Sequence, residues 1–257
     1  MAFLIDTHAH LSLFPEEEIP HILERAKTAR VKAIINICME KKELEQSVRF
    51  SSTSPKIFSG AALSPQDVAR TDGMDFLASI RLYAREKKLI AIGEAGLDYH
   101  YTSIDKELQK QFFLLQMRLA EEESLPLIVH CREAFSDLFL LANKFPTLKV
   151  VVHCFTGTKQ EAEELLKRGW YLSLSGILTF KNSNALREIA QDLPLERILI
   201  ETDSPYLAPQ TYRGKKNEPS FVSEVAKALG EIKHLSLEEI AQITTDNALS
   251  FFSLGRL

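Results

Sequence analysis

Hydrophobic residues recur along the chain in short apolar runs, and segments with helical spacing separate these runs. The runs lie at residues 3–10, 33–38, 57–63, 89–94, 126–130, 149–153, 171–175 and 197–203. Their length and their content of Val, Ile and Leu are typical of buried parallel strands. Several runs end in histidine or in a carboxylate, so we expect polar groups at the carboxyl ends of the strands.

The segments between the runs carry apolar residues at the three- and four-residue spacing of helices. We predict helices at residues 16–30, 42–50, 74–87, 105–123, 133–145, from 158 onward, 185–192, 220–231 and 237–252. In the helix at 105–123, the expected buried stripe consists of Leu108, Phe112, Leu115 and Leu119. Two helix starts have the form of capping boxes, at Thr158 with Glu161 and at Ser236 with Glu239.

Eight strands that alternate with helices require parallel strands joined by helical crossovers. At 257 residues, this pattern favours a closed (β/α)8 barrel of the TIM type over an open, doubly wound sheet. A glycine-rich dinucleotide motif does not follow the first strand, which weakens the open-sheet alternative. We find no internal repeat and no low-complexity linker. The sequence therefore predicts an α/β chain with one domain, residues 1–257.

Composition narrows the class of protein further. The chain is 45% hydrophobic and has a net charge of −4, which supports a packed core and argues against a broad basic surface. Its three cysteines form no disulfide framework and suit a reducing compartment. No signal peptide and no apolar run of transmembrane length are visible, so we expect a cytoplasmic protein without membrane contact.

Residues that bind metal ions stand at the ends of five of the eight expected strands. They are His8, His10, Glu94, His130, His153 and Asp203. In a barrel, the carboxyl ends of the strands meet on one face, where such enzymes place their active sites. A single histidine there is more often a structural residue, but chance rarely places such residues at five strand ends. We therefore expect the six side chains to form a metal site.

Six ligands are too many for one tetrahedral ion with an open position, and they suit two divalent ions. A carboxylate can bridge two ions, and Glu94 lies between Gly93 and Gly96, so we take it as the bridge. His8, His10 and Asp203 would complete one ion, and His130 and His153 the other. Asp203 and Glu94 are the expected catalytic groups, and Asp203 could also take the proton from the attacking water. Mixed nitrogen and oxygen ligands leave Mg, Mn, Zn and Co open.

Three neighbouring residues receive supporting roles. Strand alternation would place Asp6 on the same face as His8 but deeper, where it could orient a ligand. Cys131 and Cys154 directly follow two expected ligands, so alternation would turn their thiols away from the site, into the layer under the helices.

Six motifs, spread over nearly the whole chain, resemble those of the TatD family of metal-dependent deoxyribonucleases. They are DTHAHL from Asp6, GEAGLDYH from Gly93, PLIVHCREA from Pro126, HCFTG from His153, ILIETDSPYLAP from Ile198 and YRGKKNEP from Tyr212. The last two are the specific ones. The resemblance implies an amidohydrolase-like barrel, metal ligation by the six matched residues, and two-metal hydrolysis of phosphodiester bonds in DNA. A 3′→5′ exonuclease is one mode that it allows.

DNA, single-stranded or at an end, is thus the expected partner, and the sequence leaves the oligomeric state open. Arg132 and Arg213 are the candidate phosphate-binding residues. Arg132 lies two residues after the expected ligand His130, and Arg213 lies in the basic, aromatic loop after the eighth strand. Two alternatives remain: a hydrolase of a small ester, lactone or amide on the same barrel, and a barrel that only binds. The intact ligand set argues against the second.

Overall fold

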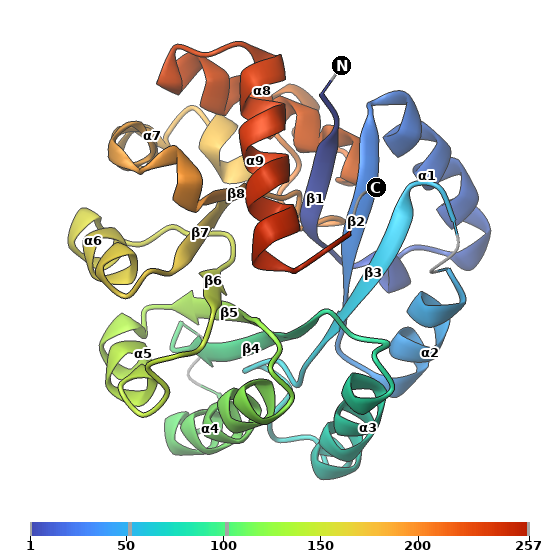
Figure 1. Ribbon diagram of the computed structural model, residues 1–257, viewed down its shortest axis with the longest axis vertical. Helices are drawn as coiled ribbons and strands as arrows, with labels where there is room; N and C mark the ends of the chain where they lie inside the picture. The colour runs from blue at the N-terminus through green and yellow to red at the C-terminus, as the bar shows by residue number, and fades with distance from the viewer. Residues whose placement is uncertain (1, 51–52, 101–102, 256–257) are drawn as a thin grey trace.

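The strands form one parallel sheet that winds into a barrel in chain order (Figure 1). A computed structural model describes residues 2–50, 53–100 and 103–255. The strands are β1 (Leu4–Ala9), β2 (Val31–Cys38), β3 (Lys56–Ala61), β4 (Ala91–Asp98), β5 (Leu127–Arg132), β6 (Val150–Val152), β7 (Tyr171–Leu174) and β8 (Ile198–Ile200). A parallel bridge between Ala9 and Ser204 joins β1 to the segment after β8. The predicted (β/α)8 barrel is confirmed.

Helices follow the strands and surround them. They are α1 (Ile19–Thr28), α2 (Lys41–Arg49), α3 (Gly73–Arg85), α4 (Lys106–Glu122), α5 (Phe135–Ala142), α6 (Lys159–Lys167), α7 (Asn184–Asp192), α8 (Val222–Lys233) and α9 (Leu237–Phe251). Single turns of 3-10 helix lie between them at Leu11–Leu13, Glu16–Glu18, Gly176–Thr179, Leu195–Arg197, Gln210–Tyr212 and Pro219–Phe221. Both predicted capping boxes are formed, at the starts of α6 and α9.

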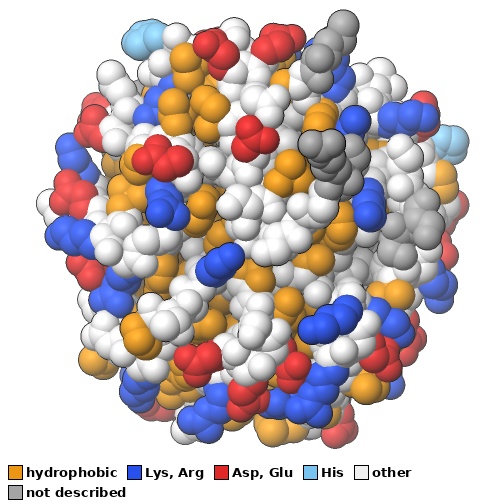
Figure 2. All heavy atoms as spheres, in the orientation of Figure 1, with side chains coloured by type: hydrophobic (Ala, Val, Ile, Leu, Met, Phe, Trp, Pro, Cys, Tyr) orange, Lys and Arg blue, Asp and Glu red, His pale blue; other side chains and the backbone are white. Residues whose placement is uncertain are grey.

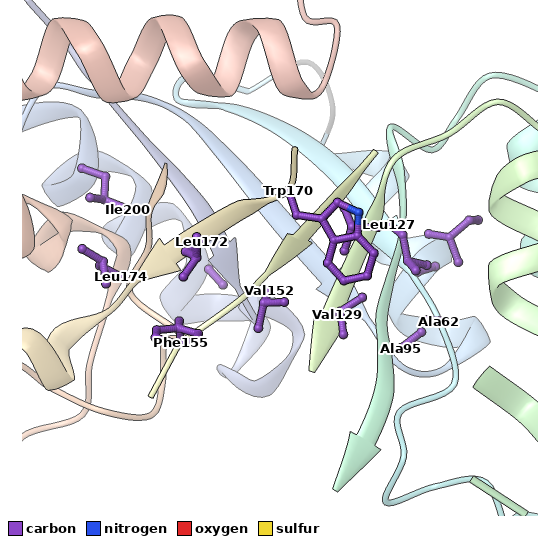
Figure 3. Packing of buried hydrophobic residues seen from close by; sticks show 14 of the residues in the cluster. Ala62, Ala95, Leu127, Val129, Val152, Phe155, Trp170, Leu172, Leu174 and Ile200 are labelled. Atoms are coloured by element: carbon purple, nitrogen blue, oxygen red, sulfur yellow. The ribbon is translucent and has the colours of Figure 1, made fainter. Parts of the chain in front are cut away.

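The core has two parts, because alternate residues of each strand face opposite sides. Val152, Leu172, Phe155 and Trp170 pack together in the larger cluster of buried residues (Figure 3). Val151 belongs instead to a smaller cluster inside the barrel. This inner cluster also contains Phe251 and Phe252 at the end of α9, so α9 closes the end of the barrel where the strands begin. Acidic and basic side chains are interspersed over the face of the molecule that carries α9 (Figure 2).

The predicted stripe on α4 is confirmed only in part. Leu119 is buried, and Leu108 and Phe112 pack against the core, but Leu115 is 42% exposed. Phe113 and Met117 are buried instead, together with two glutamines. Gln116 accepts a hydrogen bond from the Leu63 amide at 2.7 Å and donates one to the Leu63 carbonyl at 3.0 Å. Gln109 pairs in the same way with the Asp98 backbone, at 2.8 and 2.9 Å. Because strands β3 and β4 pair over only two residues each, these amides satisfy backbone groups that the sheet leaves open.

Candidate metal centre

The structure brings all six predicted ligands together at the carboxyl end of the barrel. Four donor atoms form what we call the first donor group: His8 Nε2, His10 Nε2, Glu94 Oε2 and Asp203 Oδ1. The two imidazole nitrogens lie 3.2 Å apart, and they lie 3.2–3.8 Å from the two carboxylate oxygens. Ligand atoms about 2.1 Å from a tetrahedral ion are about 3.4 Å apart, so this group fits one divalent ion.

Three further atoms form the second donor group: Glu94 Oε1, His130 Nδ1 and His153 Nε2. The Glu94 oxygen lies 2.8 Å from His130 and 3.0 Å from His153, and the two imidazole nitrogens are 3.2 Å apart. The two oxygens of Glu94 thus belong to different donor groups. A carboxylate so placed would be able to contact ions in both groups, and the chemistry of the donor set fits divalent metal ions.

Breaks in strand alternation produce this convergence. In β1, Leu4 and Ala9 both face the helices although they are five residues apart, because the pairing with β2 shifts between Asp6 and Ala9. The shift lets His8 and His10 both reach the first donor group. In β4, Ile92 and Ala95 both face the helices, and the pairing with β5 shifts between them. Glu94 therefore points into the barrel.

The prediction that the fourth strand ends at Glu94 is wrong, since β4 continues to Asp98. Two glycines allow β4 to pass close to β5. A Cβ atom on Gly96 would lie 1.9 Å from the His130 carbonyl oxygen, and one on Gly93 would lie 2.4 Å from Ile128 Cβ. Both glycines also have positive φ angles, of 150° and 155°. No other residue fits at these positions, so the position of the Glu94 carboxylate depends on them.

Two carboxylates behind the second donor group were missed by the sequence analysis. Asp98 Oδ2 accepts a hydrogen bond from His130 Nε2 at 3.1 Å, and Glu201 Oε1 accepts one from His153 Nδ1 at 3.3 Å. Each partner fixes which ring nitrogen faces a metal ion and makes that nitrogen more basic. Acidic residues at the ends of the fourth and eighth strands were the available signal. The strand boundaries alone did not show which ring they reach.

The structure places Asp6 differently from the prediction. Its carboxylate accepts hydrogen bonds from the Thr202 amide at 2.9 Å and the Thr202 hydroxyl at 2.6 Å. It contacts neither imidazole ring, because the shift in β1 puts it on the other face from His8. Burial raises the pKa of Asp6 to about 8. Asp6 thus holds the segment after β8 that carries Asp203.

Charges within the cluster stabilise one another. Burial disfavours the carboxylate of Glu94, yet the imidazoles of His153, His130 and His8 hold its pKa well below the usual range. Burial also disfavours protonated His153, but Glu94 and Glu201 hold the pKa of His153 well above its usual value. The ionised form of Glu94 and the protonated form of His153 thus each favour the other.

The predicted orientation of Cys154 is wrong, since its thiol lies at the site. Strand β6 ends at Val152, and Cys154 has a φ of 45°, so strand alternation no longer applies there. Its Sγ atom lies 3.1 Å from Ser175 Oγ. Cys154 lines a cavity of about 640 Å³, which we call the metal cavity, together with ligands of both donor groups. Cys131 packs against the larger core cluster, as predicted, although it also lines this cavity.

The two candidate phosphate-binding residues lie in different places. Arg132 ends β5 and lines the metal cavity. Arg213 lies outside the lining of that cavity, and its guanidinium is 4.4 Å from the centre of the Phe180 ring. Tyr206 lines the cavity and is 54% exposed. Tyr212 stacks on Phe221 at 3.9 Å and thus has a packing role.

Comparisons with known proteins agree along the whole chain. The family model described as TatD related DNase matches residues 5–253. An uncharacterized metal-dependent hydrolase of Bacillus subtilis, YabD, is 37% identical over 98% of this chain and 100% of its own length. The Escherichia coli relative YcfH is also named an uncharacterized metal-dependent hydrolase. It is 35% identical over 98% of this chain and 96% of its own length.

Solved structures show the same barrel. YJJV, a TatD homologue from Escherichia coli, superposes with a TM-score of 0.90 at 27% identity over 98% of both chains. A TatD family hydrolase from Entamoeba histolytica superposes with a TM-score of 0.88 at 26% identity, over 99% of this chain and 100% of its own. None of the described helices is long and apolar enough to cross a membrane. The chain belongs to the TatD family and is a metal-dependent hydrolase.

Proposed function

We propose that this protein hydrolyses phosphodiester bonds in DNA and that the six converging residues hold a pair of divalent ions. The observation that carries the proposal is that the two carboxylate oxygens of Glu94 belong to different donor groups. Each oxygen lies 2.8–3.7 Å from the imidazole nitrogens of its own group. One shared carboxylate would keep two ions close together, so that they could stabilise the attacking and the leaving oxygen of an in-line displacement at phosphorus. The description of the matching family model, a DNase, supports the same substrate.

When bound, the two ions would supply Lewis acidity at the phosphate and a more acidic water. The protein supplies the other groups. Histidine imidazoles hold the pKa of Asp203 below its usual range although burial raises it, so this carboxylate is ionised and can accept a proton from water. Arg132, at the wall of the metal cavity, would bind a non-bridging phosphate oxygen. Arg213 would contact the strand outside the cavity.

The test is digestion of end-labelled single-stranded DNA by protein that has been stripped of metal and then reloaded with Mg²⁺, Mn²⁺, Zn²⁺ or Co²⁺. We expect no cleavage in EDTA and recovery with at least one ion. Labels at the 3′ and the 5′ end distinguish exonuclease polarity from internal cleavage. Parallel assays use 4-nitrophenyl acetate and bis(4-nitrophenyl) phosphate. Hydrolysis of the acetate without cleavage of either phosphodiester would favour a carboxylic ester substrate and contradict the proposal.

A further inference from the structure

A second cavity of about 870 Å³, which we call the side cavity, adjoins the metal cavity. It lies between the loop after β5, the start of α6 and the helix α7. Cys131, Arg132 and Thr156 line both cavities. A substrate held at the donor groups can therefore extend past these residues into the side cavity. Its volume is within the usual range of small-molecule pockets.

The side cavity differs from the metal cavity in charge. Its charged lining residues are Arg132, Glu133, Lys159, Glu161, Glu188 and Asp192. Two positive and four negative side chains give a net charge of −2. Two divalent ions at the donor groups would add about +4 to the carboxylates of Glu94 and Asp203, which together carry −2. A phosphate is thus attracted to the metal cavity and repelled from the side cavity.

The acids of the side cavity are held in place by neighbouring groups. Glu161 accepts a hydrogen bond from the Thr158 amide at 2.6 Å in the capping box of α6. Asp192 on α7 pairs with Lys159 on α6 at 2.8 Å, and this pair joins the two helices beside the cavity. Glu133 lies 2.8 Å from His100 Nδ1. The negative charge is therefore part of the structure around the cavity.

Apolar surface lies between these charges. Phe135, which is 7% exposed, Ile189, which is 8% exposed, and Ala185 line the cavity. A nucleobase has apolar faces that can pack on such surface, while its N–H edges and the sugar hydroxyl can donate hydrogen bonds to carboxylates. An uncharged nucleoside matches the lining, whereas a second phosphate group does not.

We propose that the side cavity binds the nucleoside on one side of the scissile phosphate and excludes a further phosphate. The proposal rests on the phosphodiesterase function above and narrows its substrate class. A continuous strand would have to place its next phosphate among the four acids. The strand therefore ends in this cavity with a free hydroxyl, and the enzyme acts on unphosphorylated ends.

The test compares three thymidine dinucleotides: one with two free hydroxyl ends, one with a 5′-phosphate and one with a 3′-phosphate. With metal-loaded wild-type protein at low ionic strength, we expect the phosphate at one end to raise KM by about tenfold, and salt should weaken the effect. The end that is sensitive identifies which side of the substrate enters the side cavity. The proposal does not fix that direction.

Charge reversal at the cavity wall completes the test. Glu188→Lys should bring the KM values of the phosphorylated and free-ended substrates to within about twofold of each other. The matched control is Glu121→Lys, which reverses an exposed acid of α4 outside the lining of both cavities and should keep the wild-type ratio. Equal KM values for all three dinucleotides with the wild type, or an unchanged ratio in Glu188→Lys, would overturn the inference.

A failure of the proposed function gives a different result. Metal-loaded wild-type protein would then hydrolyse neither the dinucleotides nor bis(4-nitrophenyl) phosphate, and this would contradict the phosphodiesterase proposal and the inference with it. Hydrolysis of the free-ended and phosphorylated substrates with equal KM values would contradict the inference alone.

Discussion

The two donor groups of the metal centre share Glu94 but differ in how they are built. The first has four donor atoms, and its His8 side chain is fully buried. The second has three, and its His130 side chain is 21% exposed. Each imidazole of the second group has a carboxylate behind it, whereas the buried Nδ1 atoms of His8 and His10 have no hydrogen-bond partner among the described residues.

This difference indicates separate tasks. Four donors around a buried position would complete a tetrahedral shell, so an ion held by the first group would have little room for substrate. Three donors would leave a position open, and an ion held by the partly exposed second group could accept a phosphate oxygen. Asp98 and Glu201 hold the two imidazoles of the second group in the orientation that substrate binding requires. We infer that the first ion is retained and that the second exchanges and contacts substrate.

Glu94→Ala should have the largest effect, because it removes one donor from each group. We expect the loss of at least one of two bound ions and a fall in turnover of roughly a thousandfold or more, while the fold survives. The measurements are metal content by mass spectrometry, phosphodiester turnover and circular dichroism. Wild-type turnover at saturating metal would show that Glu94 is not the bridge.

Asp203→Ala and His130→Ala separate the two groups. Asp203→Ala should lose nearly all activity and weaken the first ion, whereas His130→Ala should leave the first ion bound and lose the second. Titration of metal-free protein with Co²⁺, followed by visible absorption, counts the ions and orders their affinities. If both variants lost the same ion, the division into two donor groups would be incorrect.

Acid should release the second ion before the first. A histidine with a raised pKa keeps its proton at pH values where an ordinary imidazole has lost it. Burial lowers the pKa values of His130 and His153, but neighbouring carboxylates raise both above the usual value. In the first group, the pKa of His10 is raised in the same way, but burial and His153 lower that of His8. Protons therefore compete more strongly with the second ion as pH falls.

We expect activity to fall steeply from about pH 7 to pH 5, with more than one proton involved, and added metal to restore part of it. The measurement is turnover against pH at two metal concentrations, with bound metal determined at each point. An acid limb that ignores metal concentration while the fold stays intact would speak against histidine ligation.

Asp98→Asn and Glu201→Gln should have intermediate effects. Each keeps the shape of the side chain but removes the charge behind one imidazole, so we expect the affinity for the second ion to fall by about ten- to a hundredfold. The first ion should bind as in the wild type, which Co²⁺ titration resolves. A uniform loss of both ions would indicate a structural role for these residues instead.

Arg213→Ala should have the smallest effect, because Arg213 lies outside the lining of the metal cavity. We expect weaker binding of single-stranded DNA, a decrease of about 0.7 in the salt dependence of log K, and unchanged metal content. The comparison variant is Arg132→Ala, at the cavity wall, which should also lower turnover of bis(4-nitrophenyl) phosphate. An unchanged salt dependence in Arg213→Ala would remove it from the DNA contact.

The sequence by itself determined the barrel, since alternating apolar runs and helical segments at this length leave few other folds. It also showed which residue types stand near the strand ends. The histidines at 130 and 153 follow strict alternation, because Ile128 and Val151 face the barrel interior two residues earlier. Those positions could therefore be predicted from a period of two.

Only the tertiary structure decided which of these side chains meet and by which atoms. The register shifts in β1 and β4 turn His8 and Glu94 inward, and they arise from pairing with the neighbouring strands, so the pattern of one strand does not contain them. The left-handed backbone at Cys154 brings its thiol to the metal cavity, and the alternating pattern of β6 does not predict that turn. Likewise, Asp98 and Glu201 reach imidazoles 32 and 48 residues away in sequence, and only the arrangement of the strands in the sheet brings these side chains together.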